Sequence, residues 1–343
     1  MKALLLTEPG KLEIRDLDIP EFTADEVLVK VAACGICGSD IHGFDGSTGR
    51  RIPPLVMGHE AAGTVYAIGS AVSEFREGDR VTFDSTVSCG KCRFCQQGRV
   101  NLCDDRQVLG VSCGEYCRDG AFAEFVAVPA RILYRLPDEL PMEHAALVEA
   151  VSVAVHAVRR SQLARGESAV VVGTGMIGLL VVQVLKHFGS DPVFAVDLDE
   201  RRLEQARELG ADETYLGGKE QLMDRLFDAN NGSMLEHAFE VVGISATVGT
   251  AVNAVRRGGT VTLVGNLAPE VVLPLQSVVT RELTLQGTCA SSGEYPECLE
   301  LIASGAVKVA PLISAIADLD EGPEWFDRLF HGEPGLMKVV LKP

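Results

Sequence analysis

Four cysteines within fifteen residues constrain this chain more than any other feature of its sequence. Cys89, Cys92, Cys95 and Cys103 lie in the segment SCGKCRFCQQGRVNLC with the spacing C-x2-C-x2-C-x7-C. Four thiolates at this spacing can close a tetrahedral shell around one divalent ion, and Zn²⁺ is the usual ion in such a shell. Because the protein supplies all four ligands, no position remains for a substrate. The segment therefore predicts a structural zinc site, and the chemistry must lie elsewhere.

The length and composition of the chain indicate a globular protein of two domains. Its 343 residues are too many for one simple core, and hydrophobic residues make up 47% of them. The formal net charge of -17 disfavours nucleic acid and anionic membranes as partners. The apolar stretch at residues 3–6 is too short for an export signal or a membrane span. We therefore expect a cytoplasmic protein whose ten cysteines are reduced.

The hydrophobic pattern divides the chain into a β-rich part and an α/β part. In the first 150 residues, turn residues separate short apolar runs at 27–32, 63–68, 80–83 and 123–128. From about Ser168, strands at 168–172, 193–196, 238–242, 260–264 and 283–287 alternate with helices at 179–188, 200–209 and 247–255. This alternation predicts an α/β fold with a doubly wound parallel sheet. A helix at 295–304 and a strand at 337–341 are expected to follow.

The segment from Gly173 to Gly178, GTGMIG, follows a predicted buried strand and begins a predicted helix, which is the context of a dinucleotide-binding turn. Gly173 would make the tight turn, Gly175 would let the backbone approach a pyrophosphate, and Gly178 would let the helix pack closely. Asp197 ends the next strand, where a carboxylate binds the ribose hydroxyls and repels a 2′-phosphate, so NAD is favoured over NADP. Arg201 and Arg202 keep NADP open as an alternative. The other predicted cofactor contacts are Ile177, Arg202, Val264, Gly265 and Thr288.

A second set of metal ligands is predicted in the segments CGICGSDIH and MGHEAAG. A catalytic zinc takes three protein ligands and leaves one position open. We expect Cys37, His59 and either Glu60 or Glu149 as the three ligands, with the other glutamate nearby or exchanging with the first. Cys34 is interpreted as a small core residue.

Ser39 and His42 follow Cys37 by two and five residues. If Cys37 binds the metal, Ser39 can take the proton of an alcohol that the metal polarises, and His42 can pass it outward. The nicotinamide would accept the hydride. These positions predict a zinc- and NAD-dependent oxidoreductase acting on a small alcohol.

Taken together, these motifs resemble the zinc-containing medium-chain dehydrogenase/reductase family over essentially the whole chain. The resemblance implies a GroES-like catalytic domain at 1–153, with a zinc lobe at about 86–106, and a Rossmann NAD-binding domain at 154–288. Residues 289–343 would return to the catalytic domain. The resemblance also implies a cleft between the domains and a homodimer or homotetramer. It implies the roles given above for the two zinc sites and for Ser39 and His42 as a proton relay.

The segments CGSDIH and Glu149-Ala-Val-Ser152 are similar to those of the sorbitol/iditol and galactitol-1-phosphate dehydrogenases. They imply NAD⁺-dependent oxidation of a secondary alcohol in a polyol or polyol phosphate. One alternative is L-threonine 3-dehydrogenase, whose branch commonly has Thr at the position of Ser39. Another is a non-catalytic, zinc-stabilised nucleotide-binding protein. The chain has Ala150 where the family often has Pro, and Ala290-Ser291-Ser292 where sorbitol dehydrogenases tend to have Arg-Tyr. We interpret Arg50 and Arg51 as an exposed charged loop rather than a phosphate site.

Overall fold

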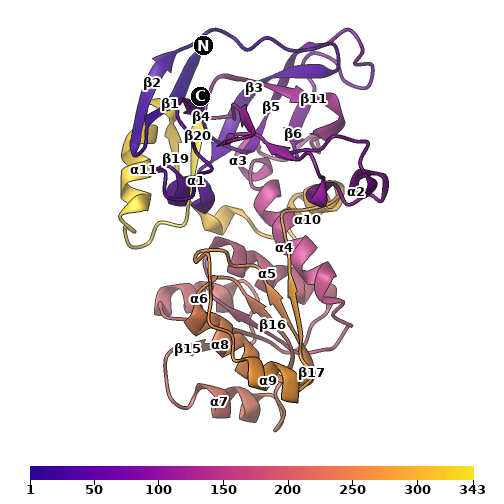
Figure 1. The fold of residues 1–343 in the computed structure, drawn as a ribbon, viewed down its shortest axis with the longest axis vertical. Coiled ribbons are helices and arrows are strands. Elements are labelled where there is room, and N and C mark those ends of the chain that lie inside the picture. The colour runs from indigo at the N-terminus through magenta and orange to yellow at the C-terminus, as the bar shows by residue number, and fades with distance from the viewer. The chain divides into compact units, whose positions relative to one another are not determined.

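The computed structural model describes residues 1–343, which form two compact units (Figure 1). The first unit contains Met1–Glu149, Ser292–Gly305 and Val309–Pro343, and the second contains Ala150–Ser291 and Ala306–Lys308. Each unit has a hydrophobic cluster of its own. None of the helices combines the length and the apolar character that a membrane crossing requires.

The first unit is built mainly from β-strands. Its largest sheet has seven strands in the order β12-β6-β5-β3-β20-β19, with β11 also paired to β3, and a second sheet has the order β2-β1-β4. The strands are β1 (Lys2–Glu8), β2 (Lys11–Asp16), β3 (Glu26–Gly35), β4 (Leu55–Val56), β5 (Glu60–Ile68), β6 (Arg80–Phe83), β7 (Thr86–Val87), β8 (Gln107–Val108), β9 (Val111–Cys113), β10 (Tyr116–Arg118), β11 (Phe125–Pro129), β12 (Leu133–Arg135), β19 (Ile313–Asp318) and β20 (Lys338–Lys342). The helices are α1 (Gly38–Gly43), α2 (Arg93–Gln96), α3 (Met142–Ala145), α10 (Tyr295–Ala303) and α11 (Gly322–Phe330).

Strand β3 organises the part of this unit that holds the candidate site. Val27, Leu28 and Val29 are all buried and Lys30 is the one exposed residue, so side chains on both faces of the strand are largely covered. The C-terminal strand β20 pairs antiparallel with the end of β3, with Leu341 opposite Cys34 and Val340 opposite Gly35. This pairing places the last residues of the chain beside the segment that leads into Cys37.

The second unit contains a six-stranded parallel sheet with the order β15-β14-β13-β16-β17-β18. The strands are β13 (Ala169–Val172), β14 (Val193–Asp197), β15 (Glu213–Leu216), β16 (Leu235–Glu240), β17 (Val255–Leu263) and β18 (Thr284–Gly287). The helices are α5 (Met176–Phe188), α6 (Glu200–Glu208), α7 (Leu222–Ala229), α8 (Ser245–Ala254) and α9 (Leu275–Thr280), and α4 (Val148–Ser161) leads into the unit. All four residues of β13 are buried, as expected for a parallel strand covered on both faces.

Several predicted elements agree with the structure within a few residues. Strand β6 has the predicted bounds, and helix α6 ends one residue before the predicted end. Strand β5 begins earlier than predicted, at Glu60, so this candidate ligand lies on the strand itself. Strand β19 was not predicted, because it lacks a continuous apolar run and only Ala317 of its residues is buried.

Candidate active site and zinc lobe

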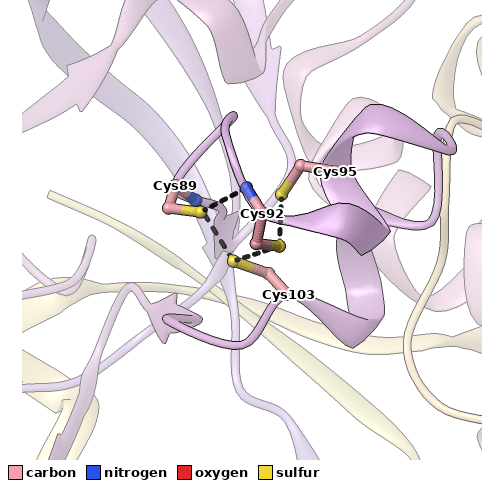
Figure 2. A group of neighbouring side chains, drawn as sticks. All are labelled: Cys89, Cys92, Cys95 and Cys103. Atoms are coloured by element: carbon pink, nitrogen blue, oxygen red, sulfur yellow. Dashed lines mark hydrogen bonds between the residues drawn. The ribbon is translucent and has the colours of Figure 1, made fainter.

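The four cysteines of the first motif converge in the loops around α2 (Figure 2). All four sulfur atoms lie within 4.8 Å of one another. The Cys92 and Cys95 sulfurs are 3.5 Å apart, and the Cys92 and Cys103 sulfurs are 3.9 Å apart. These distances are far longer than a disulfide bond, so the cysteines are free thiols.

This geometry fits a tetrahedral zinc site. Bonds of about 2.3 Å to four sulfurs at tetrahedral angles place the sulfurs about 3.8 Å apart. The backbone N–H groups of the lobe also point at the sulfurs, since Cys89 N lies 3.2 Å and Asp105 N 3.4 Å from the Cys103 sulfur. Backbone N–H groups of Cys95 and Asp104 lower the pKa of the Cys92 thiol to about 6. The lobe therefore favours the thiolate form at Cys92, whereas burial raises the pKa of Cys103 to about 12.

Cys37, His59 and Glu60 form the second group of candidate ligands, and their ligand atoms also lie within 4.8 Å of one another. Cys37 precedes α1, where the Asp40 carboxylate accepts a hydrogen bond from the Cys37 N–H at 3.2 Å. His59 and Glu60 are at the start of β5, and both are buried. Two segments about twenty residues apart in the sequence therefore meet at one buried point.

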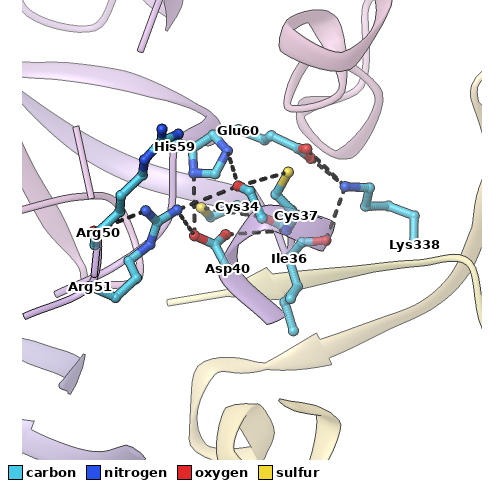
Figure 3. Close-up of polar contacts among 11 residues, drawn as sticks. Cys34, Ile36, Cys37, Asp40, Arg50, Arg51, His59, Glu60 and Lys338 are labelled. Atoms are coloured by element: carbon cyan, nitrogen blue, oxygen red, sulfur yellow. Dashed lines mark hydrogen bonds and ion pairs between the residues drawn. The ribbon is translucent and has the colours of Figure 1, made fainter. Parts of the chain in front are cut away.

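On one side of this group, Glu60 forms a buried ion pair with Lys338 of β20 (Figure 3). The Lys338 ammonium lies 2.7 Å and 2.9 Å from the two carboxylate oxygens and 3.0 Å from the Ile36 carbonyl. Lys338 is 2% exposed and Glu60 is 1% exposed. Burial lowers the pKa of Lys338, but the charges of Glu60 and Cys37 outweigh this effect and raise it. Glu60 is thus held by a cation while it remains close to Cys37 and His59.

On the other side in Figure 3, Asp40 lies between His59 and Arg51. Its Oδ1 atom is 2.9 Å from Arg51 Nη2 and 3.4 Å from His59 Nδ1. Burial disfavours an ionised carboxyl group, but His59 and Arg51 hold the pKa of Asp40 well below its usual range. Burial also disfavours a charged imidazole, yet Asp40 and Cys37 raise the pKa of His59 well above its ordinary value. The surroundings of His59 therefore stabilise positive charge, which suits a divalent cation.

Ser39 lies close to the candidate ligands, and His42 does not contact it. Ser39 Oγ is 3.4 Å from the Cys37 sulfur, 3.5 Å from His59 Nε2 and 3.4 Å from Arg51 Nη2. His42 is exposed on α1, and no hydrogen bond joins its side chain to Ser39. A proton leaving Ser39 would therefore need a bridging group to reach His42 in this arrangement.

Glu149 begins α4, and its carboxylate lies outside the close group of three ligand atoms. Burial raises the pKa of Glu149 to about 7, with His59 opposing this shift and Glu60 adding to it. Both glutamates that the sequence analysis considered are thus near His59, and Glu60 is the one whose oxygen lies within reach of the other two ligand atoms.

In the second unit, the predicted cofactor residues gather at the carboxyl ends of the parallel strands. Gly173 follows β13 with φ +98°, and Gly175 is the N-terminal cap of α5. A Cβ atom on Gly178 would lie 1.9 Å from the Gly173 carbonyl, so only glycine allows this close approach. Ile177 lies in the first turn of α5, Val264 and Gly265 follow β17, Thr288 follows β18, and Arg202 is exposed on α6.

Asp197, at the end of β14, already accepts four hydrogen bonds. Its Oδ2 atom accepts from the Thr174 N–H at 2.6 Å and from the Thr174 hydroxyl at 3.0 Å. Its Oδ1 atom accepts from the N–H groups of Leu198 and Asp199. Asp197 thus connects the glycine-rich turn to the next strand. A ribose hydroxyl would have to share or replace one of these contacts, because a carboxylate offers about four acceptor positions.

Three residues that surround the candidate ligands were not among the predicted site residues. Asp40 is part of the CGSDIH motif, and its position three residues after Cys37 is the signal that could have identified it as a cap. Arg51 was expected to be exposed, and this was wrong, because it is 5% exposed and ion-paired with Asp40. Arg50 is exposed, as expected. Lys338 had no local signal, because its partner Glu60 is 278 residues away.

Two family models match the chain. The model described as "Alcohol dehydrogenase GroES-like domain" matches residues 23–138, and the model described as "Zinc-binding dehydrogenase" matches residues 177–304. Sorbitol dehydrogenase of Bacillus subtilis (strain 168) is 33% identical over 347 residues, which cover 100% of this chain and 97% of that protein. The predicted combination of a GroES-like domain and a Rossmann domain is thereby confirmed.

Solved structures with this fold have nicotinamide dinucleotides bound. A zinc-binding dehydrogenase from Sinorhizobium meliloti 1021 bound to NADP has a TM-score of 0.89 and 32% identity, covering 100% of this chain and 99% of that chain. An alcohol dehydrogenase from Escherichia coli CFT073 complexed with NADH has a TM-score of 0.91 and 30% identity, with the same coverage. The chain therefore belongs to the zinc-containing medium-chain dehydrogenase/reductase family of oxidoreductases.

Proposed function

We propose that this protein oxidises a secondary alcohol of a polyol or polyol phosphate with NAD⁺. The observation that carries the proposal is the close group formed by Cys37, His59 and Glu60, with the Ser39 hydroxyl 3.4 Å from the Cys37 sulfur. The similarity to a sorbitol dehydrogenase over the whole chain supports a polyol as the substrate class. A protein that only bound a nucleotide would need no such group of ligands beside a hydroxyl.

In this proposal, Cys37, His59 and one of the two glutamates hold the catalytic zinc. Zinc, when bound, supplies the Lewis acidity that makes an alcohol hydroxyl a better acid. Asp40 lies 3.4 Å from His59 Nδ1, so it orients the ring and directs Nε2 toward the ligand group. Lys338 neutralises Glu60, so the charge of this carboxylate is balanced whether or not it binds the metal.

Ser39 would receive the proton of the alcohol, because its oxygen is the hydroxyl nearest the candidate ligands. Its transfer to His42 requires an intervening group, since no hydrogen bond joins the two side chains. NAD⁺, when bound, accepts the hydride that the alcohol carbon loses. The cofactor would bind at the carboxyl ends of β13, β14 and β17, with its pyrophosphate at the turn between Gly173 and Gly178.

The preference for NAD over NADP is part of the proposal and is supported by Asp197 and Leu198. The carboxylate of Asp197 would repel a 2′-phosphate, and the neighbouring Leu198, which is 78% exposed, offers no donor to one. Relatives of similar identity have NADP or NADH bound, so membership of the family alone does not decide between the two cofactors.

The test is the initial rate of NADH formation from NAD⁺ over a panel of polyols, polyol phosphates, simple alcohols and L-threonine. We expect the highest kcat/KM for one polyol or its phosphate. A preference for L-threonine would contradict the substrate class but leave the metal and nucleotide assignments intact. An enzyme that contains zinc and binds NAD⁺ but oxidises nothing in the panel would contradict the proposal.

A matched pair of variants assigns the activity to the proposed site. Ser39→Ala removes the hydroxyl beside Cys37, and we expect kcat to fall by about a hundredfold, as is usual when a proton-transfer group is lost. Ser47→Ala is the control, because Ser47 is exposed and its hydroxyl donates to the His42 carbonyl rather than to a candidate ligand. Equal effects of the two substitutions would contradict the role of Ser39.

A further inference from the structure

Arg51 is a buried cation that contacts two groups of the proposed reaction centre at once. Its Nη2 atom is 2.9 Å from Asp40 Oδ1 and 3.4 Å from Ser39 Oγ. Its Nη1 atom donates to the Arg50 carbonyl at 3.2 Å. Arg51 is 5% exposed and Asp40 is fully buried, so their ion pair is shielded from water, whereas Ser39 itself is exposed.

The side chain of Arg51 is also held along its length. A Cβ atom on Gly43, at the end of α1, would lie 2.9 Å from Arg51 Cγ. The aliphatic part of Arg51 therefore packs against the helix that carries Ser39 and Asp40. Packing and three polar contacts together fix the position of the guanidinium group.

We propose that Arg51 is a positioning residue of the reaction centre. Its Nη2 atom contacts both the Ser39 hydroxyl and the Asp40 carboxylate, and Asp40 in turn orients His59. This inference rests on the proposed function, in which Ser39 receives the substrate proton. No contact joins Arg51 to a candidate metal ligand, and Arg51 itself exchanges no proton in this proposal. Its effect on the reaction passes through Ser39 and Asp40.

The contact with Arg51 determines how the Ser39 hydroxyl can be used. A hydroxyl group has one donor and two acceptor positions. Nη2 occupies one acceptor position, so one remains for the proton of the alcohol. The hydroxyl hydrogen must then point away from the guanidinium group. Arg51 thereby sets Ser39 to receive one proton and to give one, which is what a relay requires.

The inference predicts that Arg51 and Ser39 are coupled in catalysis. We expect Arg51→Met to lower kcat by at least about tenfold with the alcohol that the wild type prefers. In a Ser39→Ala protein, the same substitution should lower kcat by a smaller factor, because only Asp40 remains of the two groups through which Arg51 acts. Equal losses in the two proteins, or a kcat of Arg51→Met close to the wild-type value, would overturn the inference.

Arg118→Met is the matched control for a purely structural effect. Arg118 pairs with Glu26 at 2.7 Å, and its Nε atom is buried without a partner, as is that of Arg51. Arg118 does not contact Ser39 or Asp40. We expect both arginine variants to lower the thermal midpoint and to keep the wild-type zinc content, while only Arg51→Met lowers kcat. If Arg51→Met does not fold, Arg51→Lys replaces it in the comparison with Arg118→Met, because lysine retains a positive charge beside Asp40.

A measurement without turnover separates this inference from the proposed function. Arg51→Met should lower the unfolding midpoint by several degrees in the wild-type protein and by less in an Asp40→Asn protein, which lacks the paired charge. Equal losses of the unfolding midpoint in the wild-type and Asp40→Asn proteins would contradict the pairing of Arg51 with Asp40, whether or not the protein is active. Lack of wild-type activity over the whole alcohol panel would contradict only the proposed function.

Discussion

At the scale of single residues, the ion pair between Lys338 and Glu60 differs from a surface pair, because both side chains are buried. In the zinc-free protein, Lys338→Met would leave the Glu60 carboxylate buried beside Cys37 with no cation. Breaking a buried pair costs about 3–5 kcal/mol of the free energy of unfolding. We expect a loss of this size in urea denaturation followed by circular dichroism.

Lys342→Met is the control for this prediction, because Lys342 lies on the same strand and pairs with Glu143 at the surface. An exposed pair contributes about 0–1 kcal/mol, so this variant should remain close to the wild type. Adding Glu60→Gln to Lys338→Met should recover part of the lost stability, since it removes the unpaired charge. Similar losses for the two lysine variants would contradict the assigned burial effect.

Asp197 is the residue on which the cofactor preference depends. Asp197→Ala should raise the ratio of kcat/KM for NADP⁺ to that for NAD⁺ by at least about tenfold, which corresponds to roughly 1.4 kcal/mol. The reason is that the carboxylate would bind ribose hydroxyls and repel a 2′-phosphate. The measurement is a kinetic comparison of the two cofactors with one alcohol.

The control substitution is Asp199→Ala, two residues further along. Asp199 caps α6 by accepting a hydrogen bond from the Arg201 N–H at 2.9 Å, so its loss should weaken the helix but keep the cofactor ratio. A ratio that is unchanged in Asp197→Ala would mean that another residue selects the cofactor.

At the scale of the element, the zinc lobe is the part of the fold that depends most on a ligand. Between residues 89 and 103, only Asn101 and Cys103 are buried, and α2 has no buried residue. So little apolar burial cannot offset the entropy of ordering the loop. The metal should therefore supply most of the folding free energy of this segment.

We expect two zinc ions per chain in the wild type and one in Cys95→Ser, measured by elemental analysis. The lobe of the variant should then be cut by trypsin at Lys91, Arg93 or Arg99, which lie within it. Cys117→Ser is the control, because Cys117 is exposed on β10 and belongs to neither cysteine group. Two zinc ions in Cys95→Ser, or cleavage of the lobe in the wild type, would contradict the prediction.

Elements defined by local patterns could be predicted from the sequence, whereas contacts between distant elements could not. Strand β6 and helix α5 follow from apolar runs between turn residues. The spacing of the four cysteines predicts the zinc lobe, and the glycine-rich segment predicts the nucleotide-binding turn. The pairing of Lys338 with Glu60 depends on β20 lying beside β3, which no local pattern specifies. The burial of Arg51 depends likewise on packing against Gly43, so an exposed loop was the reasonable but wrong expectation.

At the scale of the whole molecule, the candidate metal ligands and the candidate nucleotide residues belong to different units. Cys37, His59, Glu60 and the four lobe cysteines lie in the first unit, and the glycine-rich turn and Asp197 lie in the second. Each unit also has its own hydrophobic cluster. A ligand stabilises the residues that bind it, so the two cofactors should protect different parts of the chain.

Hydrogen exchange resolved by peptide tests this division. Saturating NAD⁺ should slow amide exchange around residues 173–178 and at Leu198 and Asp199, whose N–H groups bond Asp197. Removal of zinc by a chelator should speed exchange in 37–60 and 89–103, while exchange in the strands β13 and β14 changes little. An Asp197→Ala protein should lose the NAD⁺ protection but respond to the chelator as the wild type does. Protection by NAD⁺ confined to the first unit would contradict the assignment of the nucleotide site, because the turn at Gly173 would then have no role in binding.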